Sequence, residues 1–501
     1  MSMTKPAPKG VLRPGPTIEG GLDAIVLGDT AEGLVAAGLM AKGGLSVMVI
    51  ERGPGAGARE RREFAPGFFC DDGDPIAAAL DAGVVETLDL YRHGLSFARR
   101  RLETFVRFSD RAALIINGDP SLASEAAAAM SAADADAFRD FLERAFDDAR
   151  RFGPWFSGSD RGVVPPADDL SASLDQRLAG RFADARLEDY LRAEALLGAA
   201  GRPTEPYGWL ALPHRLAGDA AGLQGGLAAI EGGERALIAA LRRACQSLGV
   251  VFRQTDRIAS AVVEWDRVEG LALDDGGQIR APLVVSAEGA KESFLGLVSR
   301  ARLDIEFANA AAQPGPRLGS VRAHLALGRA PEDEIIASKP DRRFLLAPSA
   351  AEIQQAWRAA QDGGVGEALI AEAMIPSAID GGLAPAEGAT VSMLLHPVGL
   401  GAADDAASMK ALETAAMTSF ERIAPGAALD IDAIDFESIV PAAAPIAIAV
   451  ERRRVFAELS GIDGLFFCGP EARLGSRVSL SAGRRAAERA LAYAREKRGG
   501  R

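Results

Sequence analysis

The sequence has few cysteines and histidines, and these shortages remove whole classes of site. Three cysteines, Cys70, Cys245 and Cys468, lie far apart in 501 residues. They form neither a disulfide framework nor a CxxC metal motif, which favours a reducing, cytoplasmic location. The four histidines have neither metal-ligand nor nucleophile spacing, so we predict no metal site and expect structural roles for them. They are His93, His214, His324 and His396, and only His396, at the end of an expected strand, is a weak candidate for facing a pocket.

Positive charge and long apolar runs are also scarce. The formal net charge is −13 and the pI is near 5.1. Nucleic-acid binding needs a surplus of lysine and arginine, so we expect no nucleic-acid partner. No run approaches the ~18 apolar residues of a membrane span, although peripheral membrane contact stays open. Residues 1–21 lack the apolar core of a signal peptide and are expected to form a flexible tail.

The sequence does contain enough material for several folded domains. Hydrophobic residues make up 48% and charged residues 25%, which are ordinary values for globular proteins. At roughly 150 residues per domain, the length predicts two or three domains. The sequence leaves open whether the chain forms an oligomer or binds a protein partner.

The chain begins its folded part with a βαβ pattern. Residues 23–27 and 45–50 are apolar runs typical of buried parallel strands, and residues 32–41 between them are expected to be helical. A dinucleotide turn reads GxGxxG at this point: the first glycine makes the turn, the second admits the pyrophosphate and the third lets the helix pack closely. Gly28 and Gly33 hold the first and third places, but Thr30 holds the second.

An acidic residue follows at the position expected for a ribose ligand. Glu51 lies 23 residues after Gly28, at the end of the second strand. An acid about 20 residues after the turn binds the ribose hydroxyl in dinucleotide folds. The order of strand, turn, helix, strand and acid therefore predicts a Rossmann-like unit.

The remaining pattern predicts an α/β protein with a discontinuous Rossmann-like FAD/NAD(P)-binding domain. Residues 75–200 are mostly helical, residues 321–441 alternate as in an antiparallel sheet, and a last strand, turn and helix follow residue 464. We expect an α+β substrate domain with an antiparallel sheet and a helical cap. The predicted boundaries are 1–21 for the tail, 22–115, 220–300 and 455–501 for the dinucleotide domain, 116–219 for the cap and 301–454 for the substrate domain.

Several motifs resemble those of one flavoprotein family. After Glu51-Arg52 come Gly57-Ala58 and the stretch Ala65-Pro66-Gly67-Phe68, and Gly232-Gly233 opens a long helix. Further matches are Met374-Ile375-Pro376-Ser377 and residues 465–469. In spacing and order the chain resembles the bacterial phytoene desaturase and carotenoid isomerase family of FAD-dependent oxidoreductases, which includes proteins like pyridine nucleotide-disulfide oxidoreductase domain protein 2.

The resemblance implies an FAD cofactor and a hydrophobic substrate, polyene or lipid-like, that is oxidised or isomerised by hydride transfer to the flavin. It assigns no catalytic residue. The cofactor-binding positions that it implies are Gly28, Thr30, Gly33, Glu51, Arg52, Gly57, Gly232, Gly233, Arg235, Gly469, Gly475 and Val478.

The motifs depart from the family pattern at the cofactor contacts. Thr30 and Ala58 replace glycines, Arg235 replaces the last glycine of a GGMG turn, and the C-terminal turn carries Arg473 and Arg477. Two explanations stay open. The arginines bind the pyrophosphate in another way, or the chain is a cofactor-free pseudo-oxidoreductase that acts as a binding or assembly protein.

An acidic cluster follows the Phe68 stretch. Asp71, Asp72 and Asp74 lie within four positions of one another. Such a cluster is compatible with a cation site, but we expect a solvated loop.

Overall fold

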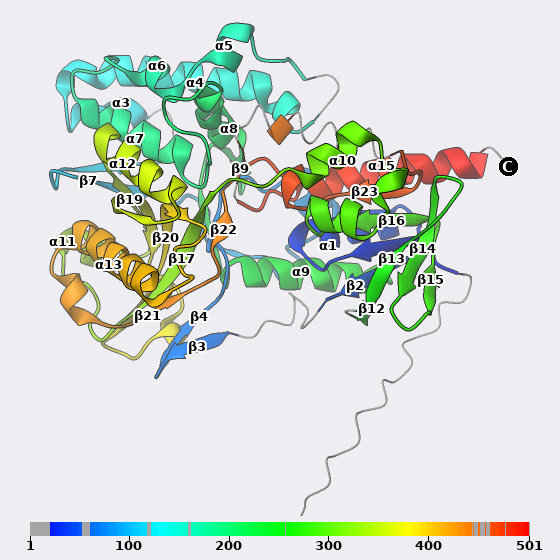
Figure 1. Ribbon diagram of the computed structural model, residues 1–501. Coiled ribbons are helices and arrows are strands. Elements are labelled where there is room, and N and C mark those ends of the chain that lie inside the picture. Colours follow the sequence, from blue (N-terminus) through cyan, green and yellow to red (C-terminus); the bar gives the residue numbers. More distant parts are fainter. Residues whose placement is uncertain are drawn as a thin grey trace, which may run out of the picture.

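The computed structural model describes residues 21–52, 61–117, 122–158, 162–255, 257–442, 444, 449–450, 456, 461–475 and 477–499. These residues form two halves, each built on a large sheet, and a group of helices (Figure 1). One half contains a five-stranded parallel sheet, and the other an eight-stranded mixed sheet. The fold is thus the α/β arrangement predicted from the sequence.

The parallel sheet is assembled from three separate parts of the chain. Its order is β12-β2-β1-β16-β23, and its strands are β1 (Ala24–Leu27), β2 (Val47–Glu51), β12 (Val251–Gln254), β16 (Leu283–Ser286) and β23 (Leu465–Phe467). Every pairing between neighbouring strands is parallel. Parallel strands are covered on both faces, which explains their continuous apolar runs. The discontinuity that the sequence predicted is present.

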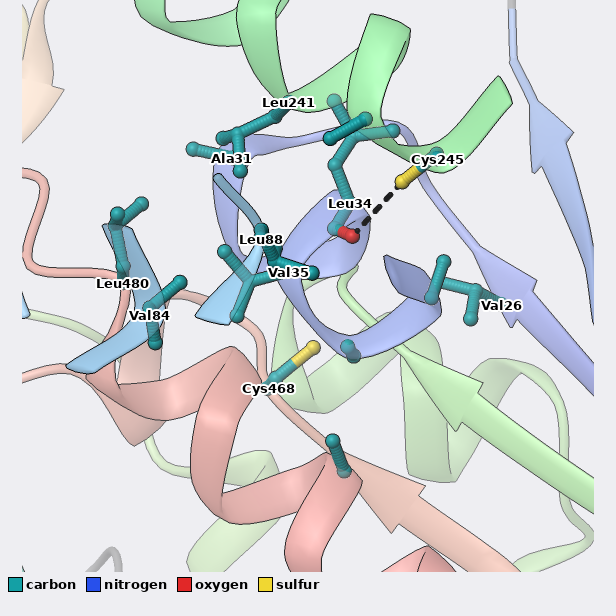
Figure 2. Close-up of a cluster of buried hydrophobic side chains, with 14 of the residues drawn as sticks. Val26, Ala31, Leu34, Val35, Val84, Leu88, Leu241, Cys245, Cys468 and Leu480 are labelled. Carbon is teal, nitrogen blue, oxygen red and sulfur yellow. Dashed lines mark hydrogen bonds between the residues drawn. The ribbon is translucent and has the colours of Figure 1, made fainter. Parts of the chain in front are cut away.

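Alternate residues of the central strands supply two different cores. Ala24 and Val26 face a core shared with the helices α1 (Ala31–Lys42), α9 (Gly233–Ser247) and α15 (Ser481–Gly499). Figure 2 shows part of this core, including Cys245 and Cys468. Ile25 and Leu27 face the opposite core, which contains residues of the antiparallel sheet β13 (Ile258–Glu264), β14 (Arg267–Leu273) and β15 (Gln278–Arg280) and of α10 (Ile305–Ala312). The period-2 pattern of buried strands thus places helices on one face and a small sheet on the other.

The second large sheet has the order β21-β17-β20-β19-β18-β7-β8, and β22 also pairs with β17. Its strands are β7 (Thr104–Phe108), β8 (Ala113–Ile116), β17 (Leu318–Leu327), β18 (Arg343–Ala347), β19 (Val365–Met374), β20 (Ala389–Gly399), β21 (Ile431–Phe436) and β22 (Val440–Pro441). The pairings are antiparallel except that of β18 with β7. The predicted domain boundaries placed residues 104–115 in the dinucleotide domain. In the structure, β7 and β8 from this segment pair within the mixed sheet. The helices α12 (Ala350–Gln361) and α13 (Ala406–Ile423) contact β19.

The helices near the top of Figure 1 form the cap region. They are α3 (Ala123–Ala128), α4 (Ala135–Phe156), α5 (Ala167–Ser171), α6 (Leu174–Leu178), α7 (Ala185–Leu196) and α8 (Ala211–Ala217). The amphipathic helix α4 buries Phe138, Phe141 and Phe152 in a core that also contains Leu345 and Ile370 of the mixed sheet. The cap is therefore packed on the mixed sheet by an aromatic core.

Several short elements complete the fold. They are β3 (Arg62–Ala65), β4 (Phe68–Cys70), β5 (Ile76–Ala77), α2 (Ala82–Thr87), β6 (Phe97–Arg99), β9 (Asp219–Ala220), β10 (Leu223–Gln224), β11 (Ala228–Ile230) and α11 (Glu334–Ser338). Among the described residues, none of the helices has the length and apolar character needed to cross a bilayer.

Candidate functional site

The turn after β1 keeps the backbone geometry of a dinucleotide-binding unit. Gly28 has a φ of +98°, which favours glycine, and its N–H donates to the carbonyl of Ile50 at 2.9 Å. A Cβ on Gly33 would lie 2.3 Å from the carbonyl oxygen of Gly28. The first and third glycines of the motif therefore have the roles in the turn and in close helix packing that their positions predicted.

Thr30 caps the helix that a phosphate would approach. It is the N-cap residue of α1, with an ordinary extended conformation, and its Oγ1 accepts a hydrogen bond from the N–H of Gly33 at 3.2 Å. Helix N-termini bind phosphate through such free N–H groups and the helix dipole. The Thr30 hydroxyl therefore satisfies one of the N–H donors of this helix N-terminus.

Carboxylates surround the same turn. An oxygen of the Glu288 carboxylate lies 3.4 Å from where a Cβ on Gly28 would be. Burial raises the pKa of Glu288; the Arg52 guanidinium opposes the rise, and the carboxylates of Glu292 and Asp29 add to it. Negative charge at this position repels a pyrophosphate.

A second helix N-terminus is closed by a carboxylate from α1. The Oε2 of Glu32 accepts a hydrogen bond from the N–H of Gly483 at 2.7 Å, and its Oε1 accepts one from the N–H of Leu480 at 3.1 Å. Both donors lie at the start of α15, and Glu32 is only 3% exposed. Glu32 occupies the place at which the helix dipole would favour an anion. Local sequence gives no signal for the role of Glu32, because its partners lie about 450 positions away.

The acid at the end of β2 is also engaged. Glu51 is buried and forms an ion pair with Arg242 of α9, whose guanidinium carbon lies 4.1 Å from the ring centroid of Phe252. The neighbouring Arg52 is exposed. Gly57 and Ala58 lie outside the described residues. The predicted ribose ligand is therefore held in a contact within the protein.

The middle glycine pair lies beside a small cavity between the two halves. Gly232 and Gly233 have φ values of +76° and +63° and begin α9. They line a cavity of about 40 Å³ together with His324 of β17 and Ser392 of β20. The Nε–H of Arg235 donates a hydrogen bond to Oδ1 of Asp71 at 2.6 Å. Arg235 is therefore paired with a carboxylate instead of being free for a phosphate.

The C-terminal turn packs against the parallel sheet. A Cβ on Gly469 would lie 1.9 Å from the carbonyl oxygen of Glu288, so this glycine is required by close packing. Gly475 has a φ of +77° and lies next to His214, and Val478 packs on the core beneath α1. Arg473 is half-buried.

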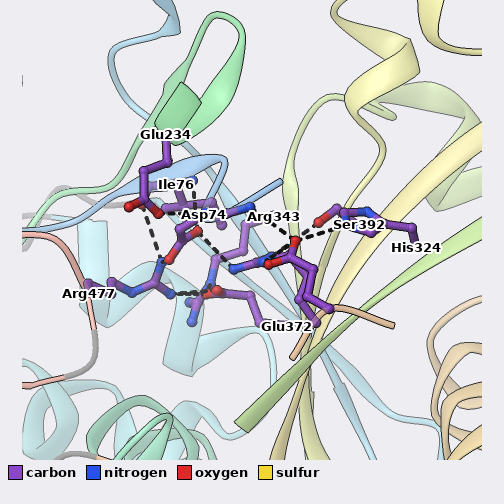
Figure 3. A network of polar contacts seen from close by, with 11 residues as sticks. Asp74, Ile76, Glu234, His324, Arg343, Glu372, Ser392 and Arg477 are labelled. Atoms are coloured by element: carbon purple, nitrogen blue, oxygen red, sulfur yellow. Dashed lines mark hydrogen bonds and ion pairs between the residues drawn. The ribbon is translucent and has the colours of Figure 1, made fainter. Parts of the chain in front are cut away.

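Arg477 belongs to a buried ionic network at the meeting of the two halves and the cap (Figure 3). Its guanidinium donates to Asp74 at 2.8 Å and to Glu372 at 2.5 Å. The carboxylate of Glu372 also accepts a hydrogen bond from Nε of Arg343 at 2.5 Å. Two opposed arginines hold the pKa of Glu372 at about 2, despite burial that acts in the other direction.

The network continues into the cap. Arg343 also pairs with Glu194 of α7, which lies 3.3 Å from Arg215 of α8. Buried charges of this kind are tolerated when they are paired and hydrogen-bonded. We call the chain Asp74, Arg477, Glu372, Arg343, Glu194 and Arg215 the interdomain ion network.

The acidic cluster is not a solvated loop, so that prediction was wrong. Asp71 lies against Arg235 and Arg61, Asp72 lies 3.2 Å from Arg62, and Asp74 pairs with Arg322 and Arg477. The side chains of Asp71 and Asp74 are only 9% and 15% exposed. The arginine partners come from distant segments, which local sequence does not indicate.

His396 is an interior residue with hydrogen bonds to both ring nitrogens. Nε2 lies 2.9 Å from the carbonyl of Ala199, and Nδ1 lies 2.9 Å from the hydroxyl of Ser320. Burial lowers the pKa of His396 to about 4. His396 therefore has the structural role expected of the histidines.

The described residues do not fit FAD. Its diphosphate would bind through free N–H donors at a helix N-terminus, but Thr30 accepts from Gly33 and Glu32 accepts from Leu480 and Gly483. In addition, the Glu288 carboxylate lies beside Gly28. Pockets for drug-sized ligands usually measure ~300–1,000 Å³, whereas the cavity beside Gly232 measures about 40 Å³.

Comparisons with known proteins agree with the architecture. No protein-family model matches the chain. The chain is 24% identical over 413 residues to the mouse pyridine nucleotide-disulfide oxidoreductase domain-containing protein 2, covering 72% of this chain and 71% of the mouse protein. The rat protein of the same name matches over the same length with the same identity.

Three solved structures span nearly the whole chain at low identity. An oxidoreductase from Methanosarcina mazei has a TM-score of 0.64 at 15% identity and covers 94% of this chain and 100% of its own. A putrescine oxidase triple mutant has a TM-score of 0.65 at 14% identity, covering 95% and 99%. The Rab GDI from Plasmodium falciparum has a TM-score of 0.54 at 12% identity, covering 96% and 98%. The chain therefore has the fold of the FAD-dependent oxidoreductases, with a Rossmann-like domain and a mixed-sheet domain.

Proposed function

We propose that this chain is a cofactor-free binding protein that keeps the fold of FAD-dependent oxidoreductases. The observation that supports this proposal is that the chain's own side chains accept hydrogen bonds from N–H groups at two helix N-termini. The Thr30 hydroxyl and the Glu32 carboxylate accept hydrogen bonds at the N-termini of α1 and α15. Because these N–H groups already have acceptors, FAD would have to displace these hydrogen bonds to use the same donors.

The ligand of such a protein is a hydrophobic small molecule. A mostly apolar cavity of about 90 Å³ lies between the cap and the C-terminal turn, and Leu196, Ala199 and Leu474 are among its lining residues. Its charged groups all have ionic partners: Glu194 pairs with Arg215, and Arg477 pairs with Asp74 and Glu372. This cavity is smaller than the engineered cavity of about 150 Å³ that holds benzene, so it would take a very small apolar molecule or one end of a longer lipid-like molecule.

A flavoenzyme is the second candidate, and one observation favours it. The backbone of Gly28 and the close packing of Gly33 retain dinucleotide geometry, and the similar proteins include an oxidoreductase and a putrescine oxidase. In its more specific form, this candidate oxidises or isomerises a polyene or lipid-like substrate, as the resemblance to phytoene desaturases implies. Function belongs to the site and not to the fold, so the cofactor decides between the two candidates.

The test begins with the purified full chain. We expect no flavin absorbance band and no change in flavin fluorescence when FAD is titrated in. Extraction of the protein followed by mass spectrometry is expected to release a hydrophobic molecule. A stoichiometric flavin in the unmodified chain would overturn the proposal and support the flavoenzyme.

A reopened variant tests the physical reason. Thr30→Gly combined with Glu32→Ala and Glu288→Ala removes the three side chains that close the site. We expect FAD affinity to rise at least tenfold over the unmodified chain if these groups are the obstacle. Glu264→Ala serves as the matched control, because this carboxylate is 55% exposed in a hairpin of the small sheet.

A further inference from the structure

Three side chains with metal-binding atoms meet at the edge of the small cavity. The Sγ of Cys70, a carboxylate oxygen of Asp72 and an imidazole nitrogen of His324 all lie within 4.8 Å of one another. Cys70 ends β4, Asp72 follows it, and His324 lies in the middle of β17. Cys70 and His324 are only 2% and 1% exposed. Tertiary structure thus brings together residues that are separated by about 250 positions.

His324 is held in one orientation and keeps an unused acceptor. Its Nε2 lies 2.9 Å from Oε1 of Glu437, where the ring N–H donates to the carboxylate. In a neutral imidazole the other nitrogen then carries a lone pair. That nitrogen, Nδ1, is buried and has no hydrogen-bond partner among the described residues. A buried acceptor without a partner is unusual in a folded protein and calls for an explanation.

We propose that Cys70, Asp72 and His324 bind a divalent transition-metal ion, with Zn²⁺ as the preferred ion. Thiolate, imidazole and carboxylate are the ligand types that Zn²⁺ takes in proteins, and three protein ligands leave a fourth position for water. Cys70 and His324 line the cavity of about 40 Å³, which has room for a water molecule. On binding, the sulfur–hydrogen bond of Cys70 breaks, a metal–sulfur bond forms and the proton passes to the solvent. No oxidation accompanies this step.

To bind zinc, the three ligand atoms need to move only slightly closer together. Bond lengths of 2.0–2.3 Å in a tetrahedral zinc site place ligand atoms about 3.6 Å apart. The three ligand atoms lie within 4.8 Å of one another, so they would each need to move by about 1 Å to reach that spacing. Asp72 lies 3.2 Å from Arg62, but Arg62 also pairs with Asp435 at 2.7 Å and keeps that partner when the metal takes Asp72.

The charges around the site favour a cation. The carboxylates of Asp72, Asp435 and Glu437 lie around Cys70, and the nearby guanidinium groups are those of Arg62 and Arg322. With Cys70 as a thiolate, anionic groups outnumber cationic ones by two, which a divalent ion balances. Glu437 is a positioning residue, because it orients the imidazole in the way that outer-shell carboxylates orient metal-binding histidines.

Metal content gives the first test. The untagged full chain is incubated with Zn²⁺, passed through a desalting column and analysed for zinc by mass spectrometry. We expect one zinc per chain, and less than one-tenth of that in Cys70→Ser or in His324→Gln. Cys245→Ala is the matched control, since Cys245 is buried in the core beneath α1 and not near this cluster. Zinc content that is the same in all variants, or that is absent from the unmodified chain, would overturn the proposal.

Cobalt provides a readout that does not depend on how the variants fold. The unmodified chain loaded with Co²⁺ is expected to show a thiolate-to-cobalt charge-transfer band, and its absence would count against Cys70 as a ligand. For Glu437→Gln we expect the stoichiometry to stay at one while the affinity for Zn²⁺ falls 10–100-fold. Unchanged affinity would contradict the positioning role. These measurements do not involve FAD, so they stand or fall separately from the proposed function.

Discussion

The glycine turn after β1 and the interdomain ion network satisfy their polar groups in different ways. At the turn, the backbone keeps the φ of +98° at Gly28, and the short side chain of Thr30 satisfies a helix N–H. In the network, long side chains such as Arg477 and Glu372 are buried and neutralise one another. A helix end can thus be closed by one hydroxyl at low cost, whereas filling the space between domains with charge requires every charge to have a partner.

The largest expected effect is in the network. Arg343→Met leaves Glu194 and Glu372 without their shared cation. Removing one partner of a buried ion pair costs about 3–5 kcal/mol, so we expect the free energy of unfolding to fall by this amount in urea titrations. Arg280→Ala is the control, because its pair with Glu264 is more than half exposed and is expected to cost under about 1 kcal/mol. An equal loss of the free energy of unfolding in the two variants would show that buried and exposed ion pairs contribute alike.

The buried His396, which carries no charge pair, predicts how stability depends on pH. The folded pKa of His396 is about 4 and the unfolded value is about 6.5, so the unfolded state binds more protons between these pH values. Stability is therefore expected to fall by on the order of 3 kcal/mol as the pH drops from about 6.5 to about 4. Unfolding in urea at pH 7 and pH 4.5 measures the loss, and His396→Gln is expected to reduce it. A variant with the same loss as the unmodified chain would refute the role of His396.

The smallest effect is expected at the turn. Thr30→Ala removes the cap of α1 and is expected to cost about 1 kcal/mol, whereas Thr30→Gly is expected to cost only a few tenths. The measurement is the free energy of unfolding of both variants under identical conditions. If Thr30→Ala were as destabilising as Arg343→Met, the turn would have to carry strain or contacts beyond the single cap.

Much of the fold was predictable from local patterns. The apolar runs predicted β1 and β2, and the order of motifs predicted a discontinuous dinucleotide domain. These elements depend on short-range periodicity and turn chemistry, which a sequence displays directly. The parallel pairing of β7 with β18 was missed, because strand partners far apart in the chain leave no local signal.

The sequence by itself determined the Rossmann-like turn, since only glycine fits the φ of Gly28 and the 2.3 Å approach at Gly33. Only the tertiary structure decided which distant groups became the partners of the buried charges. Glu32 reaches the start of α15, and Arg477 reaches Asp74 and Glu372, across hundreds of positions. The physical reason is that backbone conformation is set by neighbouring residues, whereas the partner of a buried charge is set by which distant segments the folded chain brings within hydrogen-bonding distance.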